Sequence, residues 1–173
     1  MRKKWTYKEF AEFLATQLMN ILEKFIEKRL PEWIYESFVK IKTKNLLKEW
    51  SIFETFIMAN TLLNIFKSNK YKYQMLDAFH EKINNRLVEI NIFKSQSEFN
   101  KLLRERYATY SKALGNKKSP GPLHWLSKSF CKYCKNEYDI PSIVATASYF
   151  IDISKSHKTF IDNLLKDHID IVE

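Results

Sequence analysis

The stretch from Leu46 to Phe66, LLKEWSIFETFIMANTLLNIF, is the most apolar part of the chain that still has the spacing of a single helix. At about 100° per residue, its large apolar side chains point in every direction around the helix axis. A helix that is apolar on all sides is normally a buried central helix. One carboxylate, Glu54, interrupts an apolar sector of it. We therefore expect a buried helix at residues 46–66, with the other elements packed around it.

The segments on both sides of this stretch have the one-sided apolar pattern of amphipathic helices. Two of them begin with a capping box, in which Thr6 and Glu9, or Ser95 and Glu98, satisfy each other's free backbone N–H groups. Pro31 would end the first helix, because proline is not tolerated in a helix interior. The pattern predicts helices at residues 7–29, 32–41, 46–66, 71–92, 95–114, 123–138 and 141–172, the last with a bend at 154–156.

The low content of turn-forming residues favours long helices over strands. The 173 residues include two glycines and four prolines, fewer than a β-rich fold of this length would need. With 45% hydrophobic residues, a chain of this length can bury a core as one domain. We therefore predict an all-α fold, in which a single domain, 1–173, forms an irregular bundle of about seven helices around the central helix. The loop at 115–122 holds both glycines and is the candidate for a subdomain break.

The chain has a formal net charge of +9, and its basic residues are nearly all lysines. Two interpretations stay open: a solvated lysine surface that reflects composition, or a dedicated face for a polyanion. No apolar segment of a signal peptide follows the basic start, no apolar run approaches the roughly 20 residues that span a bilayer, and only two cysteines occur. We therefore expect a cytoplasmic protein without a membrane span.

Two charged residues, Glu54 and Arg106, each interrupt the apolar side of their own predicted helix. An isolated buried charge is costly, so we expect the two to meet as a pair. Such a pair can be purely structural and fix how two helices align, or it can line a ligand pocket. Tyr110 lies on the same side as Arg106, and His80 borders the apolar stripe of another helix. These four residues form the predicted interior polar site.

The histidines and cysteines form no recognisable metal or catalytic motif. Asp77-x-x-His80 occurs once, whereas di-iron bundles carry Glu-x-x-His on two helices. Cys131-x-x-Cys134 supplies two of the four ligands that a structural zinc needs. Neither a phosphate-binding glycine loop nor a local signature of a Ser/His/Asp or Cys/His nucleophile occurs. We predict no metal and no cofactor, and we favour a non-enzymatic protein over an enzyme.

Lysines interleaved with aromatic residues surround the loop at 115–122. This pattern suits contact with nucleic-acid phosphates and stacked bases. The helix-turn-helix signature is missing, which favours non-specific phosphate contacts over the reading of a sequence. The residues of this predicted partner surface are Lys112, Lys117, Lys118, Trp125, Lys128, Lys132 and Lys135.

Two functions therefore stay open. The first hypothesis is a macromolecule-binding module whose basic and aromatic surface takes a protein or a nucleic acid. The alternative is a small-molecule- or metal-binding helical bundle with an interior polar site at Glu54, Arg106 and His80. A homodimer is also open, because surplus aromatic residues such as Trp5, Trp33 and Trp125 suit a dimer interface.

Overall fold

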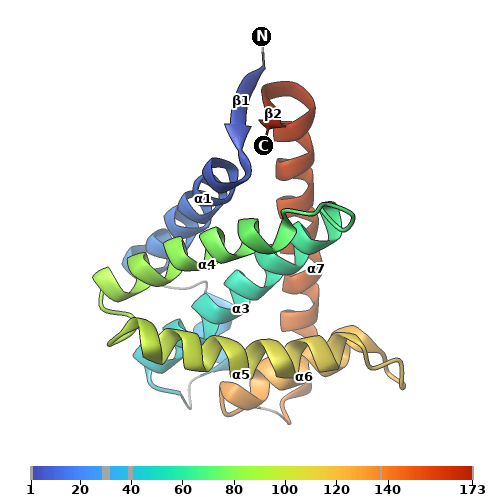
Figure 1. Ribbon diagram of the computed structural model, residues 1–173. Coiled ribbons are helices and arrows are strands. Elements are labelled where there is room, and N and C mark those ends of the chain that lie inside the picture. The colour runs from blue at the N-terminus through green and yellow to red at the C-terminus, as the bar shows by residue number, and fades with distance from the viewer. Residues whose placement is uncertain (1, 29–31, 39–40, 137, 173) are drawn as a thin grey trace.

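The computed structural model describes residues 2–28, 32–38, 41–136 and 138–172, and it confirms the all-α class (Figure 1). Within these described residues, six helices of 12 residues or more form the body, rather than the seven or so predicted. They are α1 (Tyr7–Lys28), α3 (Thr43–Ile65), α4 (Lys72–Glu89), α5 (Gln96–Leu114), α6 (Pro122–Tyr133) and α7 (Ile140–Asn163). A short helix, α2 (Glu32–Ser37), adds six residues, and a π-helical turn, η1 (Leu164–His168), follows α7.

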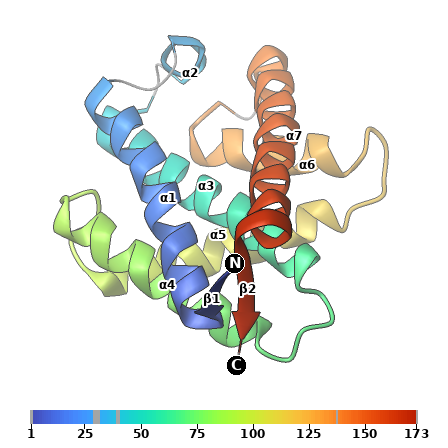
Figure 2. The same cartoon turned by 90° about the horizontal axis from the view of Figure 1, so that it is seen from above.

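Helix α3 is the buried central helix that the sequence predicts. Fourteen of its 23 residues are buried, and burial is unbroken from Glu49 to Ala59, which covers three turns on all sides. The helix packs against α1, α4, α5, α6 and α7. Figures 1 and 2 show it crossing the middle of the molecule, with the other long helices around it. Because α3 is covered on all sides from Glu49 to Ala59, its all-round apolar sequence is buried there, and Leu63 in the last turn is its exposed large apolar side chain.

Aromatic rings join the central helix to the second half of the chain. The ring of Phe53 stacks on Phe130 of α6 at a centroid distance of 4.5 Å, and it meets Tyr110 of α5 edge-on at 5.4 Å. Helices α5 and α6 also pack against each other, on either side of the loop that connects them. The basic segment around this loop is therefore carried by two helices that are anchored in the core.

The first predicted capping box is present, and the second is present in a modified form. At the start of α1, the Thr6 N–H donates to Oε2 of Glu9 at 2.7 Å, and the Glu9 N–H donates to Oγ1 of Thr6 at 3.2 Å. At the start of α5, the Glu98 N–H donates to Oγ of Ser95 at 3.2 Å. There the Glu98 carboxylate accepts from the Lys94 N–H, one residue earlier than in the standard box. Each start therefore satisfies two backbone donors that a bare helix end leaves free.

Replacing Ser95 by alanine is expected to lower the free energy of unfolding by about 1 kcal/mol, because the Glu98 N–H loses its acceptor. The measurement is the urea midpoint of unfolding at unchanged slope. Ser97 is exposed in the first turn of the same helix, and its replacement by alanine is the matched control, expected to stay within about 0.5 kcal/mol. Equal losses for the two variants would contradict a capping role for Ser95.

The C-terminal segment differs from the prediction of one bent helix at 141–172. Helix α7 runs without a break through residues 154–156, because these positions hold no glycine or proline. After η1, the chain forms β2 (Ile169–Val172), which pairs in parallel with β1 (Lys3–Thr6), Lys3 lying opposite Ile169. Figure 2 shows the two strands side by side. The predicted role of Pro31 lies outside the described residues.

Candidate functional site

Arg106 of α5 forms an ion pair with Glu49 of α3, not with Glu54 as predicted. Its Nε–H and Nη2–H groups donate to the two carboxylate oxygens of Glu49, at N–O distances of 2.8 and 2.7 Å. The two side chains are 12% and 10% exposed, so the pair lies mostly out of water. Glu49 and Glu54 are five residues apart, which places them about 140° apart around the helix axis. A buried ion pair does join α3 to α5, but its carboxylate is Glu49.

Aromatic residues of α5 and α6 surround this ion pair. The guanidinium carbon of Arg106 lies 3.6 Å from the ring centroid of Tyr133, a cation–π contact, and the Tyr133 hydroxyl shares a 2.7 Å hydrogen bond with Thr109. Tyr110, a predicted member of the site, is fully buried, and its hydroxyl has no hydrogen-bond partner among the described residues. These contacts make the pair part of the packing between α3, α5 and α6.

Glu54 is fully buried and faces α7 instead. The hydroxyl of Tyr149 donates to its Oε1, and Nε2 of His157 lies 3.9 Å from its Oε2. Within the part of the chain that the structure describes, neither this Oε2 nor this Nε2 has a hydrogen-bond partner. The core between α3 and α7 therefore holds a carboxyl group and an imidazole side by side, with no hydrogen bond between them.

Burial changes the protonation of both groups. It raises the pKa of Glu54 from 4.5 to about 7, although the hydrogen bond from Tyr149 acts in the opposite direction. It lowers the pKa of His157 from 6.5 to about 4. Both shifts favour the uncharged form, as expected for groups removed from water. At neutral pH the imidazole is therefore uncharged and the carboxyl group is near its midpoint of protonation.

His80 lies at the contact between α4 and α5. Its Nε2 is 2.9 Å from the hydroxyl of Tyr107, and its ring meets the rings of Phe79 and Tyr107 edge-on. Burial lowers the pKa of His80 from 6.5 to about 4, although the charge of Asp77 acts in the opposite direction. The imidazole is therefore neutral at physiological pH and takes part in a hydrogen bond between two helices.

Three of the four residues of the predicted interior site do not converge, and only Tyr110 lies near Arg106. Within the described ranges, no hydrogen bond or ion pair joins any two of Glu54, Arg106 and His80, because each has a different partner. Surface clefts of about 530, 410 and 610 Å³ are lined by other side chains. The geometry therefore gives no support to a small-molecule or metal site built on these residues.

Both cysteines are buried free thiols. Burial raises the pKa of Cys131 from 9.0 to about 11, and Sγ of Cys131 lies 3.8 Å from Oγ1 of Thr146. A thiol with a raised pKa is a poor nucleophile and a poor metal ligand, because both roles need the thiolate. The described residues contain no group of three or more His, Cys, Asp and Glu side chains that could hold a metal ion.

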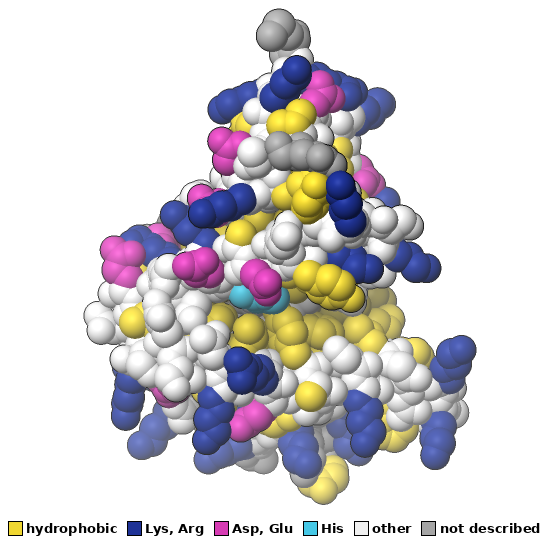
Figure 3. All heavy atoms as spheres, viewed as in Figure 1, with side chains coloured by type: hydrophobic (Ala, Val, Ile, Leu, Met, Phe, Trp, Pro, Cys, Tyr) yellow, Lys and Arg dark blue, Asp and Glu magenta, His cyan; other side chains and the backbone are white. Residues whose placement is uncertain are grey.

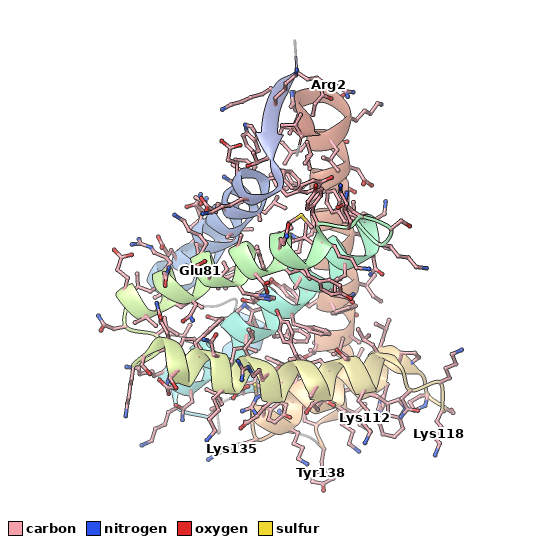
Figure 4. All side chains as sticks on the ribbon, in the orientation of Figure 1. Arg2, Glu81, Lys112, Lys118, Lys135 and Tyr138 are labelled. Atoms are coloured by element: carbon pink, nitrogen blue, oxygen red, sulfur yellow. The ribbon has the colours of Figure 1, made fainter. Side chains whose placement is uncertain are left out.

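The predicted partner surface lies along one edge of the molecule, on the end of α5, the following loop and α6. Five of its lysines are exposed: Lys112, Lys117, Lys118, Lys132 and Lys135. Trp125 and Lys128 are partly exposed. Figure 3 shows dark blue basic side chains along the lower margin, and Figure 4 shows Lys112, Lys118 and Lys135 pointing outward there.

Nearly all of the net charge of the protein comes from this part of the sequence. Residues 101–136 contain nine lysines and arginines and one acidic residue, whereas the other 137 residues contain 20 basic and 19 acidic residues. A lysine excess that only reflected composition would be spread along the whole chain. The excess of positive charge therefore lies in the segment that carries the predicted partner surface.

Two aromatic rings flank one lysine of this surface. Nζ of Lys128 lies 5.8 Å from the ring centroid of Trp125 and 5.8 Å from that of Tyr138. Tyr138 is 83% exposed, in the connection between α6 and α7, and Figure 4 shows it at the outer edge of the same face. The Nε1–H of Trp125 donates to the backbone oxygen of Lys118 at 3.1 Å, which fixes this ring against the basic loop.

The sequence pattern does not single out Glu49, Tyr149, His157 and Tyr138 for these roles. Glu49 follows Lys48 at the polar start of the apolar stretch, so it resembled an exposed charge. The two α7 residues gave no signal, because their role depends on which face of α7 meets α3. The signal for Tyr138 was available: it stands between Glu137 and Asp139, where an aromatic ring has little reason to be buried.

Comparisons with models of known protein families, with curated proteins and with solved structures give no match to this chain. None of the helices in the described residues has the length and apolar character needed to cross a membrane. A function for this protein is therefore inferred from the geometry of its surface and of its buried groups.

Proposed function

We propose that this protein binds nucleic acid through the basic face formed by α5, α6 and the loop between them. The observation that supports this most strongly is the concentration of charge: residues 101–136 carry eight basic residues besides Arg106, which Glu49 neutralises, against one acidic residue. A polyanion bound there would release condensed counterions, which is the main source of non-specific affinity for nucleic acid. The helices that carry the face are anchored in the core, so the lysines are presented by a rigid support.

The residue types on this face favour contact with phosphates over the reading of base sequence. Lysine is a flexible point charge, whereas arginine supplies the bidentate geometry that recognises guanine. Of the two arginines in the segment, Arg106 is engaged by Glu49, and Arg104 is exposed. The proposed binding is therefore largely independent of sequence and strongly dependent on salt.

The test is a salt titration of binding to mixed-sequence oligonucleotides, followed by fluorescence anisotropy. We expect the logarithm of the association constant to fall linearly with the logarithm of the salt concentration, with a slope of about −0.7 for each phosphate neutralised on a single strand. Replacing Lys117, Lys118 and Lys132 together by glutamine is expected to reduce the magnitude of this slope by about 2 and to weaken binding at every salt concentration.

The matched control replaces three exposed lysines from other parts of the surface, Lys82, Lys155 and Lys166, by glutamine. Both triple variants lose the same formal charge, so a general effect of net charge would weaken binding equally in both. We expect the control variant to keep the slope of the unmodified protein. No binding at low salt would overturn the proposed function and leave a protein partner as the occupant of this face.

A further inference from the structure

The arrangement of Lys128, Trp125 and Tyr138 points to the class of nucleic acid that the face takes, and this inference rests on the proposed function. We propose that the preferred ligand is single-stranded nucleic acid, with a base stacked on the exposed ring of Tyr138 beside Lys128. The first supporting observation is the exposure of Tyr138, which at 83% leaves most of its ring in contact with water. A free aromatic face beside lysines provides a stacking surface that a base of any type can use.

The second observation is the position of the cation. Nζ of Lys128 lies 5.8 Å from both ring centroids, so one positive charge sits next to two aromatic rings. A nucleotide carries the complementary groups, because it has a negative phosphate next to a flat base. Lys132 follows Lys128 by one turn of α6 and continues the charge along the helix, since residues four apart lie on the same side. Backbone and base therefore each have a matching group on this surface.

The third observation is the support of Trp125. Its Nε1–H donates to the Lys118 backbone oxygen at 3.1 Å, and the ring of His124 meets it edge-on at a centroid distance of 5.3 Å. These contacts tie the ring to the loop that carries Lys117 and Lys118. The exposed lysines of the loop therefore keep a fixed position relative to the aromatic rings of α6. A single strand of nucleic acid that contacts both groups requires this fixed position.

A duplex cannot use this arrangement fully, because its bases are paired and stacked inside the helix. It can contact the lysines through its phosphates, but it has no free base face for Tyr138. A single strand can do both, and stacking on an aromatic side chain strengthens its binding by about 5- to 150-fold per base. The structure therefore favours a single strand over a duplex of equal length.

The test compares a labelled mixed-sequence strand of roughly 16 nucleotides, the upper end of site sizes for single-strand-binding domains, with the same strand annealed to its complement. We expect the single strand to bind more tightly than the duplex at equal salt. Replacing Tyr138 by alanine is expected to weaken single-strand binding about 5- to 150-fold and to leave duplex binding unchanged. Replacing Tyr138 by phenylalanine is expected to preserve single-strand binding, because the ring face remains.

The control is Tyr73 of α4, which is 65% exposed and has Nζ of Lys72 at 5.1 Å from its ring centroid. It reproduces the local chemistry of an exposed tyrosine beside a lysine outside the proposed face, so Tyr73→Ala is expected to have no effect on binding. Equal affinity for strand and duplex, with no effect of Tyr138→Ala, would overturn the single-strand preference while the lysine face still bound nucleic acid. Absence of binding to both probes at low salt would instead overturn the proposed function itself.

Discussion

Replacing Arg106 by methionine is expected to lower the free energy of unfolding by about 3 to 5 kcal/mol. The variant removes two hydrogen bonds of 2.8 and 2.7 Å and leaves the Glu49 carboxylate mostly buried with no opposite charge. An unpaired charge at such a position costs much more than the pair contributes, because its hydration is lost without compensation. Urea unfolding followed by circular dichroism measures the loss.

Arg104→Met is the matched control, because Arg104 is exposed on the same helix, and we expect it to change stability by less than about 0.5 kcal/mol. A second comparison replaces both partners, Glu49 by leucine and Arg106 by methionine. This double variant is expected to recover most of the loss, since no buried charge remains. If Arg106→Met were no more destabilising than Arg104→Met, the ion pair would have no structural role.

Substitutions in the carboxyl–imidazole pair of Glu54 and His157 are expected to change how the free energy of unfolding depends on pH. The native pKa of Glu54 is raised from 4.5 to about 7, so its contribution to stability is present below pH 4.5 and is lost as pH rises toward 7. The native pKa of His157 is lowered from 6.5 to about 4, so its contribution is present above pH 6.5 and is lost as pH falls toward 4. The two dependences have opposite signs and offset each other between about pH 4.5 and 6.5.

Single substitutions are expected to reveal each dependence separately. Relative to the unmodified protein, Glu54→Gln should gain about 3 kcal/mol in stability as pH rises from 4.5 to 7, because it lacks the carboxyl group that resists ionisation. Relative to the unmodified protein, His157→Gln should also gain about 3 kcal/mol in stability, but as pH falls from 6.5 to 4. The measurement is the free energy of unfolding in urea at several pH values.

Each variant is compared with the unmodified protein at the same pH, so the titration of every other carboxylate cancels. Thr159 is exposed on the same helix as His157 and has no titratable group, so Thr159→Ala is the control, expected to give a difference that varies little with pH. Differences for Glu54→Gln and His157→Gln that did not vary with pH, or that varied in the same direction, would show that burial does not shift these two groups as the structure indicates.

The helical body could be predicted from the sequence because its signals are local. The apolar residues around the whole circumference of 46–66 identify a buried helix, and α3 is that helix. The two capping boxes identify helix starts, since their hydrogen bonds join residues three apart. The strand pair was missed because Lys3–Thr6 and Ile169–Val172 lie at opposite ends of the sequence, and four residues each are too few to show a period of two.

The interior pairing could be predicted only in part. Burying an isolated charge is costly, so the sequence indicates that Arg106, on an apolar helix face, needs a carboxylate partner. Which carboxylate it meets, Glu49 or Glu54, depends on the rotation of α3 relative to α5, and the sequence does not determine that rotation. The lysine surface was predictable because the exposure of Lys112 and Lys132 follows from helical periodicity, and that of Lys117 and Lys118 from the polar composition of the loop. Its aromatic component was incomplete, because the predicted helix at 123–138 included Tyr138, whereas α6 ends at Tyr133 and leaves Tyr138 in the connection to α7.

The parallel pairing of β1 with β2 determines how the molecule would respond to mechanical tension. Lys3 lies opposite Ile169 and Thr6 opposite Val172, so the two strands run in the same direction. Pulling Lys3 and Val172 apart would slide one strand along the other and load the hydrogen bonds of the ladder together, not one after another. A tether attached at these two positions would therefore meet its first resistance in the small sheet, before any force reached the helices.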